Sequence, residues 1–332
     1  MRAVVVVSVV ASLLLAGCTA GRTTGATAPP TSGQGVDSKS AAEIFPGGLY
    51  TAPNTHAAEA TARLAAEGNS AEAAAIAKIS SQPTAIWLAD SKNGSTKVGP
   101  VLQKYVKAAK AQSKTLVFVT YTIPNRDCGG YSAGGMSSAD YVEWNRTIAK
   151  NLAGTHSVIL VEPDSLAMLT KPRCASERTS RPPLIRQAVD ILTSAGLTVY
   201  LDAGNSHWVK PAAMAALLRS AGVDKARGFF TNVSNYYRVD QERSYANILS
   251  KDLGGKHFVI DTSRNGNGWQ GHWCNPPGAA LGQNPHVSKG TTKLDALLWV
   301  KHPGDSDGAC NGAPVAGQWD ESYALDLVRN RS

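Results

Sequence analysis

The chain has 332 residues, of which 43% are hydrophobic and 17% are charged, and its formal net charge is +8 at pH 7. This composition excludes an intrinsically disordered chain, and the length is ample for one large domain with its own core. The basic residues are spread along the sequence, so we expect no nucleic-acid partner.

The first 17 residues have the pattern of an export signal. The stretch MRAVVVVSVVASLLLAGC begins with a basic residue and continues with an apolar run too short to span a membrane and remain there. Its last four residues resemble the bacterial lipobox, which implies cleavage before Cys18 and attachment of lipid to its sulfur. A secretory signal cleaved elsewhere and a retained membrane helix are the alternatives. We therefore expect export, with lipid anchoring to the outer face of the cell membrane or release from the cell.

Residues 18–44 are predicted to form a flexible tether. They are rich in Thr, Ser, Gly, Ala and Pro and show no apolar periodicity. A second domain does not fit into so short a stretch. We therefore expect one folded domain at residues 45–332, and we expect it to be monomeric.

Seven short apolar runs, rich in β-branched and aromatic residues, recur along this domain with helical patterns between them. They cover residues 84–90, 115–124, 157–164, 197–204, 228–236, 257–265 and 295–305. Helices are predicted at residues 99–112 and 182–196, the second beginning at proline and ending at glycine. Alternating strands and helices predict an α/β fold with a parallel sheet.

Polar residues at the ends of nearly all the runs favour a seven-stranded parallel β/α barrel. In a barrel, the site is built from the carboxyl ends of several strands. A doubly wound open sheet, the alternative, would gather its polar residues at one switch point. The first strand is followed by no dinucleotide-binding motif, and the sequence contains no P-loop.

Four cysteines remain after Cys18, and an even number in an exported chain favours two disulfides. Four cysteines allow three pairings. Neighbour pairing closes two loops of similar size, each contributing about 4 kcal/mol in the chain-entropy model. Zinc is the rival interpretation, but no pair has the spacing of a metal site, so we expect no metal. The four residues are Cys128, Cys174, Cys274 and Cys310.

The run VILVEPDSLAML ends a buried strand on two acids, Glu162 and Asp164. Several acids facing one cleft indicate either divalent-metal binding or acid–base cleavage of a glycosidic bond. Tryptophans at or just beyond strand ends favour a sugar site, because an indole face can stack on a sugar ring. Packing in the core or at the rim is the alternative for each of them. These tryptophans are Trp87, Trp208 and Trp273.

Over roughly residues 45–328 the sequence resembles glycoside hydrolase family 6, the inverting cellulases. The two signature stretches are YTIPNRDCGGYSAGG (121–135) and VILVEPDSLAML (158–169). Five further blocks follow in the family's order: LDAGNSHW, TNVSNY, VIDTSRNGNG, WCNPPG and LLWVKHPGDSDG. The resemblance implies a distorted seven-stranded barrel, neighbour-paired disulfides, and a catalytic domain that cleaves β-1,4-linked glucan without a cofactor.

The resemblance also implies roles for individual residues. Asp164 is expected to be the general acid, because burial and a neighbouring like charge raise the pKa of a carboxyl. Asp127 is expected to support its protonation and to help order the hydrolytic water, while Asp307 is the candidate base, acting directly or through water. Tyr121 is expected beneath the sugar at the cleavage point. Substrate-holding roles fall to Trp87, Asn205, Trp208, Asn235, Trp273, Lys301 and Asp305.

Two departures from the family pattern concern the site. Ala133 stands where many relatives carry serine, so we expect the adjacent Ser132 to position the water. Asp305 stands where glutamate is more usual, which shortens that side chain by one methylene.

The short segment between the last two cysteines bears on the mode of action. Processive members of the family enclose the cleft with long loops, and this segment leaves little room for one. We therefore expect an open groove and endo action. The alternatives are an exo-acting cellobiohydrolase, a catalytically weak glucan-binding lipoprotein and a transporter's solute-binding protein.

Overall fold

The computed structural model of the chain describes residues 1–5, 38–89 and 97–331. Cys18 and most of the expected leader and tether lie outside these residues. The chain divides into two units, Met1–Thr31 and Ser32–Ser332, and every element below belongs to the second. Among the described helices, none combines the length and apolar character that crossing a membrane requires.

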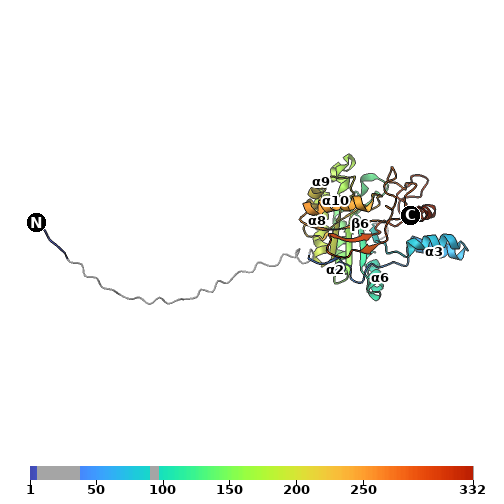
Figure 1. Ribbon diagram of the computed structural model, residues 1–332, viewed down its shortest axis with the longest axis horizontal. Helices are drawn as coiled ribbons and strands as arrows, with labels where there is room; N and C mark the ends of the chain where they lie inside the picture. The colour runs from blue at the N-terminus through green and yellow to red at the C-terminus, as the bar shows by residue number, and fades with distance from the viewer. Residues whose placement is uncertain (6–37, 90–96, 332) are drawn as a thin grey trace. The chain divides into compact units, whose positions relative to one another are not determined.

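Eight strands form one sheet in the order β1-β2-β3-β4-β5-β6-β8-β7, with helices packed around it (Figure 1). They are β1 (Ile86–Ala89), β2 (Leu116–Tyr121), β3 (Ser157–Val161), β4 (Thr198–Asp202), β5 (Gly228–Thr231), β6 (His257–Asp261), β7 (His286–Val287) and β8 (Leu294–Leu298). All neighbours pair in parallel except β7, which runs antiparallel to β8. The predicted α/β fold with a parallel sheet is thus confirmed, and the count of seven strands is corrected to eight.

The sheet is a half-barrel and not the predicted barrel, since within the described residues no ladder joins β1 to β8 or β7. Single hydrogen bonds instead connect the β1 segment to the loop after β8. The backbone N–H of Ala85 donates to the carbonyl of Trp299 at 3.0 Å, and the indole N–H of Trp87 donates to the carbonyl of Val300 at 2.8 Å. We call this junction the seam.

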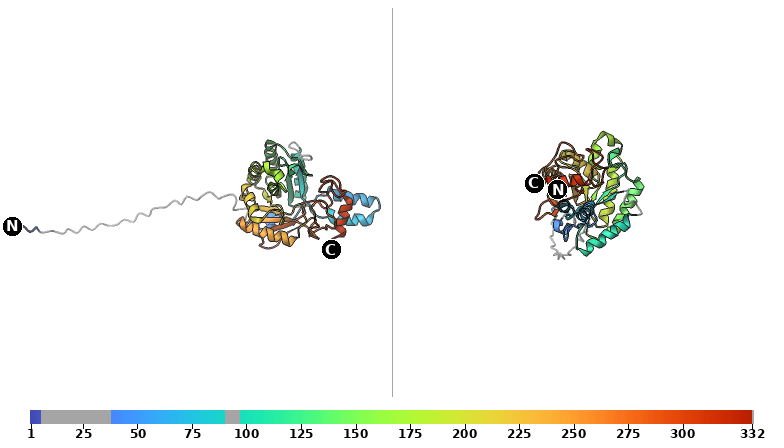
Figure 2. Two further views of the ribbon diagram at one scale, coloured as in Figure 1. Left: turned by 90° about the horizontal axis from the view of Figure 1, so that it is seen from above. Right: turned by 90° about the vertical axis from the view of Figure 1, so that its right-hand side faces the viewer.

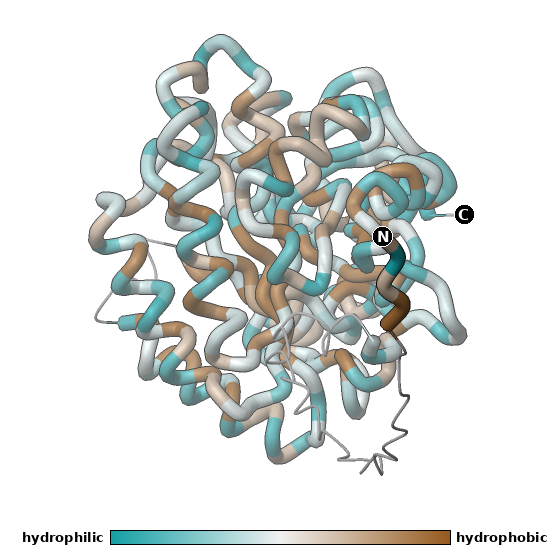
Figure 3. The backbone as a smooth tube through the Cα atoms, turned by 90° about the vertical axis from the view of Figure 1, so that its left-hand side faces the viewer, coloured by the Kyte–Doolittle hydropathy of each residue, from teal (hydrophilic) through white to brown (hydrophobic). Residues whose placement is uncertain are grey.

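The central strands are buried on both faces, which explains their nearly unbroken apolar sequence. Alternate side chains fill the inside of the half-barrel, among them Val119 and Leu160, while their neighbours Phe118 and Ile159 pack against the helices outside. Figure 3 shows the apolar strands running through the centre of the domain. This packing makes the strands a rigid base for the loops that follow them.

The longer helices are α3 (His56–Ala66), α4 (Ser70–Ser80), α6 (Val98–Ala111), α7 (Ser138–Leu152), α8 (Arg181–Ser194), α9 (Pro211–Ser220), α10 (Val239–Asp252) and α11 (Glu321–Arg329). The short α2 (Ala41–Ile44) occupies the last four residues of the expected tether. Helices α6 and α8 agree with the two predicted helices to within two residues. Helices α3, α4 and α11 share a separate apolar cluster, and Figure 2 shows the blue N-terminal helices beside the red C-terminal one.

A buried ion pair closes the amino-terminal edge of the sheet. Arg227, just before β5, donates from Nε and Nη2 to the carboxylate of Asp295 at 2.9 Å, and both side chains are fully buried. Tyr200 and His257 also contact this carboxylate, at 2.6 and 2.9 Å. Such a pair is stable in the core only because its hydrogen-bonding groups are satisfied. Arg227 also donates to the carbonyl of Lys39 at 2.7 Å and so holds the start of the domain.

Candidate active site

Three acids from different loops meet at the carboxyl edge of the sheet. Asp164 follows β3, Asp127 follows β2 and Asp307 follows β8. The half-buried carboxyl of Asp164 has its pKa raised to about 7, first by burial and then by the charges of the other two acids, against the opposing charge of Lys301. The structure therefore brings together the three carboxyls that the sequence singled out.

The backbone turns sharply where β3 ends. Glu162 and Asp164 both have positive φ, 53° and 68°, on either side of Pro163. Non-glycine residues adopt such angles at a cost and only where the surroundings impose them. The turn sends the two acids in different directions. The buried carboxylate of Glu162 accepts from the backbone N–H groups of Thr122 and Ile123, each at 3.0 Å, behind the strand.

A hydrogen-bonded chain connects Tyr121, Ser132 and Asp127. The Tyr121 hydroxyl lies 2.8 Å from Ser132 Oγ, which in turn donates to Asp127 Oδ2 at 3.0 Å. The backbone N–H of Ser132 donates to the same oxygen at 3.0 Å. A Cβ at Gly130 would lie 2.2 Å from this oxygen, so the loop requires glycine there. Ser132, which the sequence analysis proposed as the residue that positions the water, thus bonds to Asp127 through both its backbone and its side chain.

The second oxygen of Asp127 pairs with Arg173 at 3.0 Å. Arg173 lies beside Cys174, which is joined to Cys128 by a disulfide across 46 residues. This disulfide therefore holds the acid and its basic partner near one another. Burial and then the charge of Asp164 raise the pKa of the Tyr121 hydroxyl. The Trp87 ring packs edge-on against Tyr121, with centroids 5.1 Å apart.

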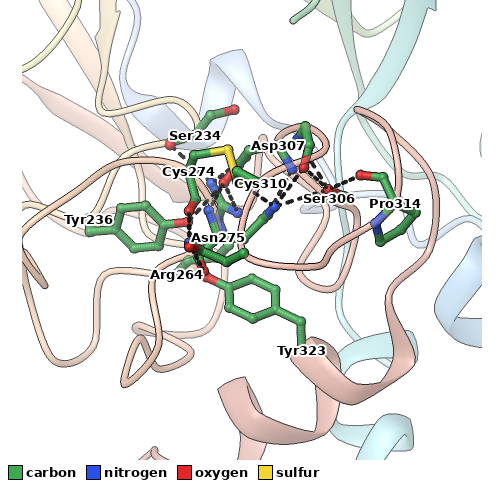
Figure 4. The surroundings of a disulfide bond; sticks show 12 residues. Ser234, Tyr236, Arg264, Cys274, Asn275, Ser306, Asp307, Cys310, Pro314 and Tyr323 are labelled. Atoms are coloured by element: carbon green, nitrogen blue, oxygen red, sulfur yellow. Dashed lines mark hydrogen bonds and ion pairs between the residues drawn. A yellow bond between two sulfur atoms is a disulfide. The ribbon is translucent and has the colours of Figure 1, made fainter.

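Asp307 lies at the centre of a dense hydrogen-bond network (Figure 4). Arg264 grips both oxygens of its carboxylate at 2.9 Å, and Lys301 Nζ lies 3.3 Å from one of them. Tyr236 donates from its hydroxyl at 3.1 Å, and the backbone N–H of Asn275 donates at 3.0 Å. Burial alone would raise the pKa of Asp307, but the charges of Arg264 and Lys301 bring it below its ordinary value. This acid therefore stays ionised.

Arg264, Tyr236 and Asn275 were not singled out from the sequence. Arg264 follows β6 within the block VIDTSRNGNG, and Asn275 follows Cys274, whose disulfide partner is Cys310. Asn275 also accepts the backbone N–H of Asp307 at 2.8 Å, so the two residues hold each other. The sequence signal that could have revealed this network is an arginine just after a strand predicted to be buried, because a buried charge needs a partner of opposite charge.

The expected substrate-holding residues have different degrees of exposure. Trp273 is 47% exposed, and its ring contacts that of Tyr131 with centroids 5.9 Å apart. Trp87 and Trp208 are half-buried, and Lys171 Nζ lies 5.7 Å from the Trp208 ring centroid. The structure thus leaves one indole largely open to solvent and two partly so.

The two expected asparagines make bonds within their own loops. The buried Asn205 accepts the backbone N–H of His207 at 3.0 Å, and Asn235 donates to the carbonyl of Val233 at 3.1 Å. Lys301 donates to the carbonyl of Ser306 at 2.9 Å in addition to its contact with Asp307. The side chains that the sequence analysis assigned to substrate binding therefore also hold their own loops in place.

The chain matches the family model described as "Glycosyl hydrolases family 6" over residues 47–331. It is 42% identical over 283 residues to Endoglucanase A of Cellulomonas fimi, covering 85% of this chain and 61% of that protein. It is 36% identical over 293 residues to Endoglucanase 1 of Streptomyces halstedii, covering 85% and 88%. The endoglucanase Cel6 from Mycobacterium tuberculosis, solved in complex with methyl-cellobiosyl-4-deoxy-4-thio-β-D-cellobioside, is 40% identical, with a TM-score of 0.79 and coverage of 85% and 96%.

Proposed function

The chain belongs to glycosyl hydrolase family 6, and from this premise we propose that it hydrolyses internal β-1,4-glucosidic bonds in cellulose or a related β-glucan, with inversion at the anomeric carbon. One observation carries the proposal. Asp164, with its pKa raised to about 7, faces two further carboxyls at one edge of the sheet. Two acids on opposite sides of the scissile bond, one protonated and one ionised, are what inverting hydrolysis requires.

Asp164 is assigned the role of general acid. A carboxyl with a pKa of about 7 is partly protonated at neutral pH and is well matched to donating a proton to the glycosidic oxygen as the bond breaks. Lys301 contributes a positive charge that favours the carboxylate left behind. Tyr121 and the stacking faces of Trp87, Trp208 and Trp273 are assigned to holding the sugar rings.

The water that attacks the opposite face of the sugar is assigned to Asp127 and Ser132. Asp307 is less suited to accept a proton, because Arg264, Lys301, Tyr236 and Asn275 already occupy its oxygens. Its fixed negative charge instead stabilises the positive charge that develops on the sugar ring. Asp127, with 17% of its side chain exposed, is the acceptor we assign for the proton that the water releases.

The test is a product profile on cellohexaose with anomer detection, comparing the wild type with Asp164→Asn. The wild type should release products whose new reducing ends are α-anomers. The carboxamide of the variant cannot transfer a proton to the leaving oxygen, so turnover should fall by about a thousandfold while oligosaccharide binding is kept. β-Anomeric products would contradict inversion. Equal binding by both proteins with no sugar released would support the alternative, a glucan-binding lipoprotein.

We also propose export with lipid attached to Cys18, and a monomeric protein. The two disulfides support an oxidising compartment outside the cytoplasm. Labelling with radioactive palmitate tests the anchor: label should enter the wild type and not Cys18→Ala. Label retained in that variant would contradict the proposal.

A further inference from the structure

The carboxylate of Asp305 is gripped by two histidines from different parts of the fold. Nδ1 of His56, the first residue of α3, lies 2.8 Å from Asp305 Oδ1. Nδ1 of His302, from the loop after β8, lies 3.2 Å from Oδ2. Asp305 itself is only 8% exposed. Each oxygen therefore has its own imidazole partner, and we call His56 and His302 the histidine clamp.

The other side of the His302 ring is fixed as well. Its Nε2 lies 2.7 Å from the carbonyl oxygen of Ala85, at the seam. A ring nitrogen that faces a carbonyl must carry hydrogen to bond with it, so Nε2 donates. His302 thus connects Asp305 to the residue that precedes β1, and its ring is held at both nitrogens.

The clamp also sets the charge of Asp305. Burial favours the neutral acid, but the hydrogen bonds of His302 and His56 lower the pKa of Asp305 below its ordinary value. Lys301 adds a favourable charge from the same loop. The three residues are not a metal site: their atoms face one another, and no group of three or more His, Cys, Asp or Glu residues in the described part of the chain is arranged to hold a metal ion. The clamp therefore holds a fixed anion.

A fixed anion of this kind still has bonding capacity. An ionised carboxylate offers about four acceptor positions, and the histidines use two. Asp305 is also one methylene shorter than the glutamate more usual at this position. A shorter side chain has less freedom to adjust towards a bound sugar, so the position in which its carboxylate is held matters more.

We propose that His56 and His302 are positioning residues for substrate binding, which hold the short Asp305 side chain where it accepts hydroxyl groups of the bound glucan. The inference rests on the proposed function and on the substrate-holding role that the family resemblance implies for Asp305. It predicts that the clamp acts on affinity and not on the chemical step.

Two isosteric changes at His302 separate positioning from a structural role at the seam. The amide nitrogen of Asn can take the place of Nδ1 and keep the bond to Asp305, while that of Gln can take the place of Nε2 and keep the bond to Ala85. If the clamp positions the carboxylate, His302→Gln should raise the KM for cellotetraose about tenfold with kcat within about threefold, and His302→Asn should restore the KM. His156→Ala, an exposed histidine before β3, is the control and should behave as the wild type.

A double-mutant cycle gives an independent readout. The dissociation constant for cellotetraose is measured by calorimetry in an Asp164→Asn background for His302→Ala, Asp305→Ala and the two together. Because His302 acts through Asp305, the double variant should bind no more weakly than Asp305→Ala alone. His56→Ala should give the same pattern. Additive losses, or a KM restored by Gln and not by Asn, would overturn the inference while leaving the proposed function intact. A wild type that neither binds nor cleaves the tetrasaccharide would remove the proposed function itself.

Discussion

At the scale of single residues, the turn after β3 places two neighbouring acids, Glu162 and Asp164, in different surroundings. Positive φ at Glu162 and Asp164 turns the first carboxylate back onto the loop that begins at Thr122 and the second towards Asp127 and Asp307. Burial raises the pKa of both acids to about 7, but Glu162 accepts backbone N–H groups behind the strand, whereas Asp164 also faces the charges of Asp127 and Asp307. The turn thus separates an acid held by the backbone from the acid that we propose as the general acid.

The raised pKa of Asp164 makes the rate depend on pH in a definite direction. The reactive form is the protonated one, so kcat/KM should fall as pH rises through about 7. Asp127→Asn removes the neighbouring charge that is the second cause of the raised pKa, and should move this fall to lower pH in the residual activity. Initial rates between about pH 5 and 9 measure both effects. Asp326→Asn, on the outer helix α11, is the control, and an unmoved fall in Asp127→Asn would contradict the assignment.

Several of the candidate site residues lie in the two signature stretches and bear functional groups typical of sugar chemistry. Asp164, Asp127 and Ser132 were singled out in this way. Arg264 and Asn275 were not, because their role depends on loops after β6 and β8 meeting at Asp307, a contact between distant segments. The histidine clamp was missed for the same reason, since 249 residues separate His56 from Asp305.

At the scale of elements, hydrophobic patterns located every parallel strand but placed the strand ends too late. The run at residues 228–236 ends as a strand at Thr231, because the backbone takes up positive φ at Asn232 and Ser234. The polar residues included at the end of each run belong to loops. The two-residue β7 left no signal, since pairing with β8 determines it and not its own sequence.

The way in which the half-barrel closes likewise could not be predicted from the sequence. Alternating strands and helices predict a parallel sheet, but they do not say whether its first and last parallel strands pair. Here single bonds at the seam replace a ladder, and they involve loop residues after β8.

The disulfide between Cys274 and Cys310 supports the loops around Asp307. It closes a loop of 36 residues, so Cys274→Ser combined with Cys310→Ser should lower the free energy of unfolding by about 4 kcal/mol. Denaturant unfolding of the oxidised proteins measures this loss. The same pair of changes at Cys128 and Cys174 is the matched control for loop closure and should cost a similar amount. An unchanged midpoint would show that the crosslink adds nothing to stability.

At the scale of the whole molecule, the proposed endo action requires a site that is open along its length. The short segment between Cys274 and Cys310 led us to predict an open groove, and the exposed Trp273 ring on this side is consistent with it. An open groove admits the middle of a chain, so soluble carboxymethylcellulose should lose viscosity well before reducing ends accumulate. Viscometry alongside a reducing-sugar assay measures the two rates. Release of cellobiose alone, from chain ends, would contradict endo action and favour a cellobiohydrolase.

Lys39 lies at the amino-terminal edge of the sheet, where its carbonyl accepts a hydrogen bond from Arg227. Asp127, Asp164 and Asp307 follow the carboxyl ends of their strands, at the opposite edge of the sheet. If Cys18 carries lipid as proposed, the chain that leads from it enters the domain at Lys39, so the point of attachment and the proposed active site lie at opposite edges of the domain's sheet.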